Sequence, residues 1–331
     1  MQRKQQIESW LADLFPGQSL NLVPASEDAS QRRYFRTTLD DGSTRIIMDA
    51  PPAKEDCRPF IQIREVFANA GVHVPMIYAQ DLAQGFLLLE DFGTTMYQDV
   101  LNADTMRNLY LDAIDAMINI QLASRPGVLP DYDEAFLARE IDIFQEWYLP
   151  HEAKLTLSTE QQGWFDNTKQ VVLKSVLAQP KVFVHRDFHS RNLMVCKPNP
   201  GIIDFQGALY GPLAYDLMSL LKDAYLEWEE EQVLDLVIRY WERARKVGLP
   251  VPPDVTEFYK DFEMVGVQRQ LKVVGIFARL AHRDGKTGYL IDLPRVWDYL
   301  RKNATRYIQL KPLLKLMDEI EGRQPQVGYT F

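Results

Sequence analysis

Residues 182–192 read VFVHRDFHSRN, and residues 202–207 read IIDFQG. Two short apolar runs flank the polar loop, and Asp204 follows the next apolar run. Because Asp187 and Asn192 stand at opposite ends of one loop, we expect both side chains, and that of Asp204, to reach the same cleft. Two carboxylates and an amide oxygen are hard ligands of the kind that Mg²⁺ prefers. A carboxylate beside a metal-bound nucleotide can also orient and deprotonate a hydroxyl, so the spacing predicts phosphoryl transfer.

The rest of the chain divides around this stretch into a strand-rich beginning and a helical remainder. Before residue 92 the patterns predict helices over 1–16 and 58–70 and strands over 20–24, 33–39, 44–48 and 85–90. Beyond it, helices are predicted over 104–123, 133–147, 158–178, 213–226, 229–247, 254–282 and 294–319. We therefore expect an α+β protein with a small β-rich lobe over 1–92 and a large helical lobe over 93–331.

Composition excludes several classes of protein. The chain has 331 residues, a formal net charge of −9 and 46% hydrophobic residues, which is typical of a globular protein. The negative charge disfavours nucleic acid as a partner, and no apolar run is long enough for a membrane span. The first residues lack the apolar core of a signal peptide, and two cysteines are too few for a disulfide framework. We expect a cytoplasmic protein; its oligomeric state is open at this point.

The paired motifs carry a family resemblance. HRDFHSRN followed by IIDFQGA resembles the H-x-D-x-x-x-x-N and D-F-G-like elements of protein-kinase-like enzymes, and is most similar to the aminoglycoside phosphotransferase family. The resemblance implies a two-lobed protein-kinase-like fold with ATP and Mg²⁺ as cofactors. It implies that Asp187 is the catalytic base and that Asn192 and Asp204 hold the metal. Asp216, in GPLAYD, is then expected to brace the catalytic loop.

Two further stretches look like the nucleotide-binding elements of that family. Residues 27–36, EDASQRRYFR, resemble the loop that covers the phosphates, and an ordinary polar turn is the alternative. Residues 85–93, GFLLLEDFG, resemble the hinge that meets adenine, and a simple buried strand is the alternative. The residues that these resemblances nominate for nucleotide binding are Ser30, Gln31, Arg32, Arg33, Leu89, Glu90 and Phe92.

The strand over 44–48 departs from the protein-kinase pattern. Protein kinases carry a lysine on this strand for the α- and β-phosphates, whereas the inward position here is Ile46 or Met48. Arg32, Arg33 or Arg45 could supply the cation instead. The departure also leaves open a nucleotide-binding regulatory module with weak catalysis.

Candidates for the acceptor site lie in the helical region. Glu146, Trp147 and Tyr148 place a carboxylate beside two aromatic rings, which suits a sugar, although a packed helix end is equally plausible. Arg269, Lys272, Arg279 and Arg283 share one helix face, which could receive an anion or could be an acid-paired face. His189 is a candidate for acceptor contact or for loop support.

A wider set of segments, including SQRRYFR, EWYL and QRQLKVVGIFARLAHRDGKTGYL, narrows the resemblance. They are similar to family members that phosphorylate the anomeric C1 hydroxyl of N-acetylmuramate or N-acetylglucosamine in peptidoglycan recycling. An amino sugar is therefore the implied partner of Glu146, Trp147, Tyr148, His189 and Arg279. An aminoglycoside, choline or another small alcohol is the alternative acceptor.

Overall fold

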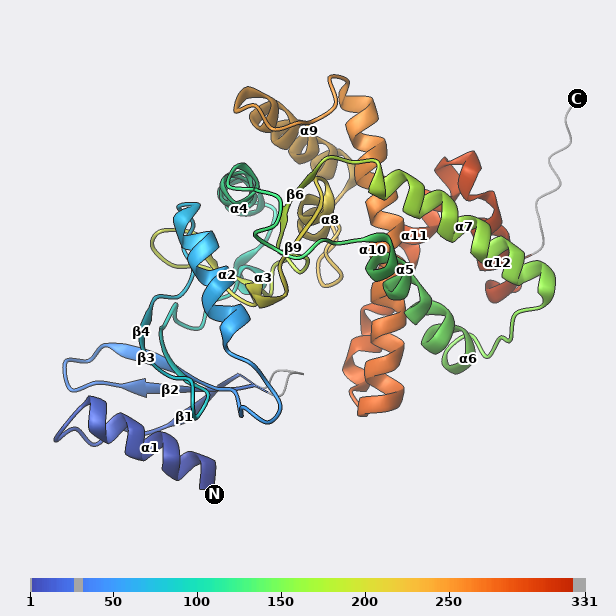
Figure 1. The fold of residues 1–331 in the computed structure, drawn as a ribbon. Coiled ribbons are helices and arrows are strands. Elements are labelled where there is room, and N and C mark those ends of the chain that lie inside the picture. Colours follow the sequence, from blue (N-terminus) through green and yellow to red (C-terminus); the bar gives the residue numbers. More distant parts are fainter. Residues whose placement is uncertain (1, 27–31, 324–331) are drawn as a thin grey trace, which may run out of the picture. The chain divides into compact units, whose positions relative to one another are not determined.

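The computed structural model describes residues 2–26 and 32–323 (Figure 1). Its contacts divide the chain into two compact units. The first unit comprises residues 1–100 together with 192–207, and the second comprises 101–191 together with 208–331. The predicted division at 92/93 differs from this one, because residues 93–100 and the later segment 192–207 join the first unit.

The first unit is built on an antiparallel sheet of five strands in the order β1-β2-β3-β5-β4. Short connections join the antiparallel pairs β1–β2, β2–β3 and β4–β5. The turn between β2 and β3 contains Asp41-Gly42, a dipeptide typical of hairpins. The elements of this unit are α1 (Gln2–Leu14), β1 (Val23–Ser26), β2 (Arg33–Thr38), β3 (Thr44–Asp49), α2 (Arg58–Asn69), β4 (Ile77–Asp81), β5 (Phe86–Glu90), α3 (Tyr97–Val100), β7 (Leu193–Met194), β8 (Gly201–Ile202) and η2 (Phe205–Gly207).

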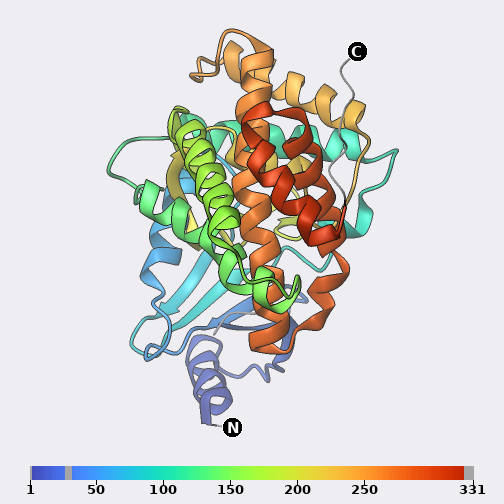
Figure 2. The ribbon, with the colours of Figure 1, turned by 90° about the vertical axis from the view of Figure 1, so that its right-hand side faces the viewer.

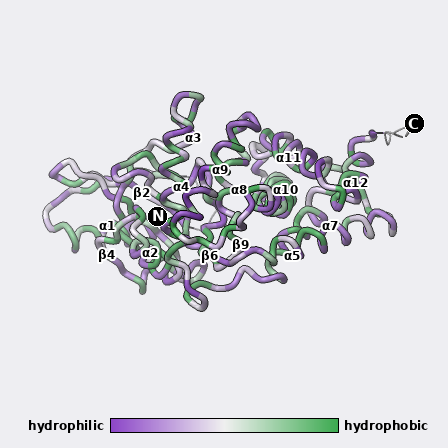
Figure 3. Tube along the Cα trace, turned by 90° about the horizontal axis from the view of Figure 1, so that it is seen from above, coloured by the Kyte–Doolittle hydropathy of each residue, from purple (hydrophilic) through white to green (hydrophobic). Residues whose placement is uncertain are grey.

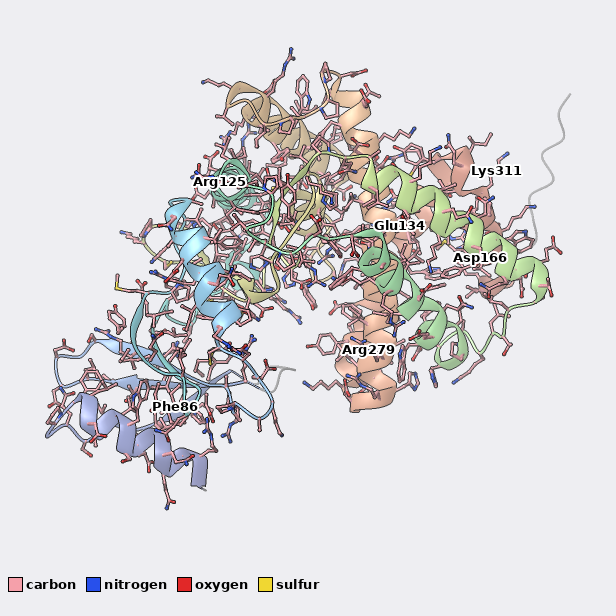
Figure 4. All side chains as sticks on the ribbon, in the orientation of Figure 1. Phe86, Arg125, Glu134, Asp166, Arg279 and Lys311 are labelled. Carbon is pink, nitrogen blue, oxygen red and sulfur yellow. The ribbon has the colours of Figure 1, made fainter. Side chains whose placement is uncertain are left out.

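Helix α1 covers one face of this sheet. Ile7 and Leu11 of the helix form a buried cluster with Ile47, Phe86 and Leu88 of the strands, and Figure 4 labels Phe86 beside α1. Side chains alternate between the faces of a strand, so Leu89 lies on the face opposite to α1. Apolar burial closes the α1 face, and on the opposite face the side chain of Leu89 is only 3% exposed.

The second unit consists mostly of helices. Its elements are α4 (Met106–Leu122), α5 (Glu134–Ile143), η1 (Phe144–Tyr148), α6 (Leu149–His151), α7 (Thr159–Leu177), β6 (Lys181–Val184), β9 (Leu209–Pro212), α8 (Tyr215–Leu221), α9 (Glu230–Lys246), α10 (Val255–Asp284), η3 (Thr287–Ile291), α11 (Leu293–Arg306), η4 (Ile308–Leu310) and α12 (Lys311–Glu321). The only sheet here that the described residues show is the antiparallel pair β6 and β9.

The 30-residue helix α10 forms the centre of this unit. It lies between α7 and α11 (Figure 2), and hydrophobic residues gather along the trace around α8 and α10 (Figure 3). At Gly275 the helix passes so close to η1 that an added Cβ would lie 2.5 Å from the backbone of Ile143 and of Phe144. Only glycine permits this approach, which fixes where α10 stands against α5 and η1.

Most predicted elements are confirmed, but helix α3 and strands β4 and β9 were not predicted, and one predicted helix is divided in two. Strand β4 was not predicted, because its side chains are half-buried or exposed and give no apolar run. The single helix predicted over 294–319 is wrong: α11 ends at Arg306 and α12 begins at Lys311, with Pro312 at its first turn. No helix in the part of the chain that the structure describes has the length and apolar character needed to cross a membrane.

Candidate active site

The loop that follows β6 is anchored by Asp216, in the first turn of α8. The backbone N–H groups of His185 and Arg186 donate to its carboxylate at 2.6 Å and 2.9 Å. Asp216 is 1% exposed, and burial raises the pKa of its carboxyl. This is the bracing contact that the family resemblance implies, and it holds the two residues that precede Asp187.

Arg186 adopts a left-handed backbone conformation, with φ of 76°. Such a conformation costs roughly 1–3 kcal/mol in a residue with a side chain and persists only where its surroundings enforce it. Here Glu140 of α5 pairs with the guanidinium at 2.5 Å, and the rings of Phe136 and Tyr132 lie 4.8 Å and 5.3 Å from it. The same carboxylate receives Lys272 of α10 at 3.1 Å. Glu140 therefore ties the loop to α5 and α10.

Asp187 is half-buried in a strongly cationic surrounding. Burial by itself raises the pKa of a carboxyl, but the positive charges of Lys272, Arg269 and neighbouring groups outweigh it and hold the pKa of Asp187 well below its usual range. Asp187 is therefore ionised at neutral pH. It can orient a hydroxyl and accept its proton late in the transfer, when the proton has become acidic.

The remainder of the loop is fixed by Asp223. Its carboxylate accepts from the backbone N–H and the hydroxyl of Ser190 at 3.0 Å and 2.5 Å. The ring of His189 packs edge-on against Tyr225, with centroids 5.5 Å apart, and burial lowers the pKa of His189 to about 4. His189 is thus neutral at pH 7, so it can share a hydrogen bond with a substrate without adding charge.

Asn192 and Asp204 lie together in the first unit, where strands β7 and β8 form a short antiparallel pair. The backbone N–H of Ile203 donates to the carbonyl of Asn192 at 3.1 Å, and the side-chain Nδ2 of Asn192 lies 3.5 Å from Oδ2 of Asp204. Asp204 is exposed and left-handed, with φ of 62°, and Gln206 donates to its other oxygen. The pair brings a carboxylate next to an amide side chain, and carboxylate and amide oxygens are ligands that suit a hard divalent cation.

The predicted hinge residues occupy three different environments. Leu89 is 3% exposed. The carboxylate of Glu90 is hydrogen-bonded to His73 at 3.1 Å and to the backbone N–H of Met76 at 3.1 Å. Phe92 packs against His73 and closely against Gly201. The side chains of Glu90 and Phe92 are thus occupied by contacts within the first unit, and their predicted role in nucleotide binding stays a prediction.

The arginines offered in place of a strand lysine are engaged elsewhere. Arg32 pairs with Glu55 at 3.3 Å, and Arg33 pairs with Asp49 on the face of the sheet that α1 covers. Arg45 lies 4.3 Å from the ring of Tyr78. Ser30 and Gln31 fall outside the described residues, so their predicted role stays a prediction.

The residues predicted to contact the acceptor also lie in different environments. Glu146 pairs with Arg139 on the surface, and Trp147 stacks on His151 with centroids 5.4 Å apart. Tyr148 is 7% exposed because Phe144 and Trp297 cover its ring, which favours a packing role. Arg279 is half-buried toward the C-terminal end of α10 (Figure 4), and its Nε has no hydrogen-bond partner among the described residues.

The amino-acid sequence is similar to those of known proteins. Residues 21–249 match the model of the phosphotransferase enzyme family. The chain belongs to that family. An N-acetylmuramate/N-acetylglucosamine kinase of Neisseria meningitidis is 46% identical to it over the full length of both chains. A kinase of the same name from Pseudomonas putida is also 46% identical, over 97% of each chain.

Solved structures confirm the protein-kinase-like fold. A choline kinase from Cryptosporidium parvum aligns with a TM-score of 0.64 at 13% identity, over 95% of this chain and 99% of its own. A choline kinase from Streptococcus pneumoniae aligns with a TM-score of 0.64 at 11% identity, over 91% and 100%. In this phosphotransferase the small antiparallel sheet and the helical unit are the two lobes that the sequence predicts.

Several residues that hold these segments in place within each unit were not singled out from the sequence. Glu140, Asp223 and Tyr225 hold or line the catalytic loop, and Arg36 ties β2 to Asp91 beyond β5 at 2.9 Å. The sequence does contain an indication of the role of Glu140, because this carboxylate lies on the apolar face of α5 between Leu137 and Ile141. A carboxylate on a buried face requires a partner, so its position indicates an internal ion pair.

Proposed function

We propose that the chain transfers the γ-phosphoryl group of ATP to the anomeric C1 hydroxyl of N-acetylmuramate or N-acetylglucosamine. The observation that carries the proposal is the 46% identity, end to end, to kinases named for those two sugars. The loop chemistry supports it, because Asp187 is held ionised beside buried cations. We place the reaction in the cytoplasm, where ATP is available and peptidoglycan sugars are recycled.

Asp187 has the properties of the group that acts on the acceptor. Its carboxylate stays ionised, and its loop is braced by Asp216 and by the pair of Arg186 with Glu140. Such a group accepts a hydrogen bond from the attacking hydroxyl, orients its lone pair and takes the proton as transfer proceeds. Positioning and electrostatic stabilisation account for most of the rate enhancement in phosphoryl transfer.

Asn192 and Asp204 are the residues that we propose hold Mg²⁺. When bound, the ion would neutralise charge on the nucleotide phosphates. The described residues contain no group of three or more His, Cys, Asp or Glu side chains that could hold a metal ion, and the proposed pair supplies one carboxylate and one amide. A small protein ligand set is usual for Mg²⁺ bound with a nucleotide, since phosphate oxygens and waters fill the remaining positions.

An acceptor screen tests the proposed function. The purified protein is incubated with Mg²⁺, ATP and, separately, N-acetylmuramate, N-acetylglucosamine, glucose and kanamycin, and the products are examined by NMR. We expect turnover of the two N-acetylated sugars, with phosphorus coupling to the anomeric carbon and its proton. Phosphate on another carbon, or turnover of kanamycin in place of the sugars, would contradict the proposal.

A nucleotide-binding module with weak catalysis remains the second candidate, favoured by the absence of a lysine from β3. The two candidates separate in a calorimetric titration with ATP and Mg²⁺ followed by an acceptor-dependent assay for ADP. Binding of ATP without turnover across the sugar panel would support the module.

A further inference from the structure

Arg269 is a buried arginine on α10 for which the described residues provide neither a hydrogen bond nor an ion pair. The residue is 5% exposed, and its Nε is buried without a partner. Removing a guanidinium from water is costly unless another group pairs with it. Arg269 lies within electrostatic range of Asp187 but makes no direct hydrogen bond or ion pair among the described residues, so its guanidinium remains able to bind an anion that arrives with a ligand.

Asp187 is the carboxylate within electrostatic range of Arg269, and it also feels the charges of Lys272 and Arg186. The other carboxylates of neighbouring elements are engaged by other groups. Glu140 already binds Arg186 and Lys272. Asp223 accepts from Ser190 and from the backbone N–H of Tyr225 at 3.0 Å. These pairings leave Arg269 available, one helical turn before Lys272.

Arg269 also lies within electrostatic range of the loop that carries the candidate base. Its positive charge contributes to the lowered pKa of Asp187, and it opposes protonation of His189, whose Nδ1 is likewise buried without a partner among the described residues. A ligand anion that reached Arg269 would thus be close to the group that we propose acts on the acceptor hydroxyl.

A cluster of aromatic rings that includes Tyr225 lies within electrostatic range of this cation. Tyr225 packs between His189 and Phe277, at centroid distances of 5.5 Å and 6.3 Å, and Phe277 lies 5.4 Å from Tyr289. Phe277 is on α10, two turns beyond Arg269. Rings next to a few polar groups are typical of a small-molecule site.

We propose that Arg269 binds the carboxylate of an acidic acceptor and is the residue by which the enzyme distinguishes N-acetylmuramate from neutral N-acetylglucosamine. The inference rests on the proposed function and adds the determinant of substrate choice. N-acetylmuramate carries a lactyl carboxylate on the same ring as its C1 hydroxyl, so the anion and the reacting oxygen are separated by about one sugar ring. Guanidinium matches carboxylate through two parallel hydrogen bonds, which an ammonium cannot reproduce.

The experiment compares three acceptors: N-acetylmuramate, its neutral lactyl carboxamide, and N-acetylglucosamine. For the wild type we expect kcat/KM for the acid to exceed that for the carboxamide about ten- to hundred-fold, the range for losing a hydrogen bond to a charged group. Arg269→Gln should abolish that preference, chiefly through KM for the acid, and Arg269→Lys should restore it in part. Arg239→Gln is the matched control, because Arg239 is paired with Asp235 on the exposed side of α9, and it should keep the wild-type preference.

The outcomes separate the two proposals. Equal kcat/KM for the acid and the carboxamide with the wild type overturns the role of Arg269, and this comparison holds even if the variants do not fold. An equal loss for all three acceptors in Arg269→Gln also overturns it, since the residue then serves the common chemistry. If the wild type phosphorylates none of them, the proposed function fails, and calorimetry with N-acetylmuramate on the wild type and Arg269→Gln decides the carboxylate site. Equal affinities in that titration overturn it.

Discussion

At the scale of single residues, the catalytic loop shows how burial and charge assign roles that residue identity leaves open. Asp187, Asp216 and Asp223 are three aspartates in or around one loop. Asp216 and Asp223 accept backbone hydrogen bonds and fix the chain, whereas Asp187 is surrounded by cations that keep it ionised. The first two are positioning residues, and the third has the charge state of a base.

Replacing Asp187 tests the role of its carboxylate. Asp187→Asn keeps the shape of the side chain and removes its basicity, so kcat should fall by about two orders of magnitude or more, the usual scale for a positioned base. Acceptor-dependent release of ADP measures the loss, and calorimetry checks that ATP still binds. Wild-type turnover by this variant would contradict the assignment.

Glu140 is predicted to be essential for stability. Its side chain is 6% exposed and receives Arg186 and Lys272, so Glu140→Gln would leave buried positive charge without its partner. We expect the free energy of unfolding in urea to fall by about 3–5 kcal/mol. Glu146→Gln is the control, because that carboxylate is 45% exposed in its pair with Arg139 and its loss should cost about 0–1 kcal/mol. Equal effects of the two changes would contradict the prediction.

His189 is predicted to make stability depend on pH. Its pKa is about 4 in the folded protein against an ordinary value of 6.5, chiefly because burial opposes its charge. As the pH falls from 6.5 to 4, His189 becomes protonated in the unfolded chain but stays neutral in the folded chain. The free energy of unfolding therefore falls by up to about 1.4 kcal/mol per pH unit from this group. His189→Gln should flatten the curve of unfolding free energy in that window. Parallel curves for the two proteins would exclude the effect.

At the scale of elements, α10 links packing to the site, because Arg269 and Lys272 project from the helix that Gly275 places against η1. Gly275→Ala puts a methyl group 2.5 Å from backbone atoms, so α10 must shift and stability should fall by about 1–3 kcal/mol or more.

The control for that change is Gly163→Ala in α7, where an added Cβ meets nothing within 4 Å. Removing a flexible residue from a helix interior should stabilise the protein by about 0.5–1 kcal/mol. Thermal and urea unfolding measure both variants. The same sign of effect at the two glycines would show that the close approach at Gly275 is unimportant.

At the scale of the whole molecule, binding of the metal–nucleotide complex should stabilise the folded chain. At one hundred times its dissociation constant, a ligand specific for the folded state adds about 2.7 kcal/mol. We expect Mg²⁺ with ATP to raise the unfolding midpoint and EDTA to remove most of the increase. The Asp204→Asn variant should lose the part of the increase that depends on the metal. The control is Asp56→Asn, because Asp56 forms an exposed ion pair with Arg58, and this variant should keep the full increase. An increase that is unaffected by EDTA would exclude Asp204 as a metal ligand.

The sequence by itself determined the reaction class and the architecture. Local spacing carries that information, because strand-loop-strand patterning places Asp187, Asn192 and Asp204 along one short segment, and the helical periodicity of the remainder fixes the larger lobe. That Asp187 acts at one site with the other two stays a prediction, since it belongs to the second unit and they belong to the first.

Only the tertiary structure decided which charged residues are free to act. On the sequence, Arg33, Arg269, Lys272 and Arg279 look alike, and Glu140 and Glu146 lie on the same helical stretch. In the folded chain Arg33 pairs with Asp49 and Lys272 pairs with Glu140, whereas Arg269 is buried with no direct hydrogen bond or ion pair among the described residues. These differences depend on contacts between segments that lie far apart in the chain, and the cost of burying a charge depends on which partner the fold brings to it.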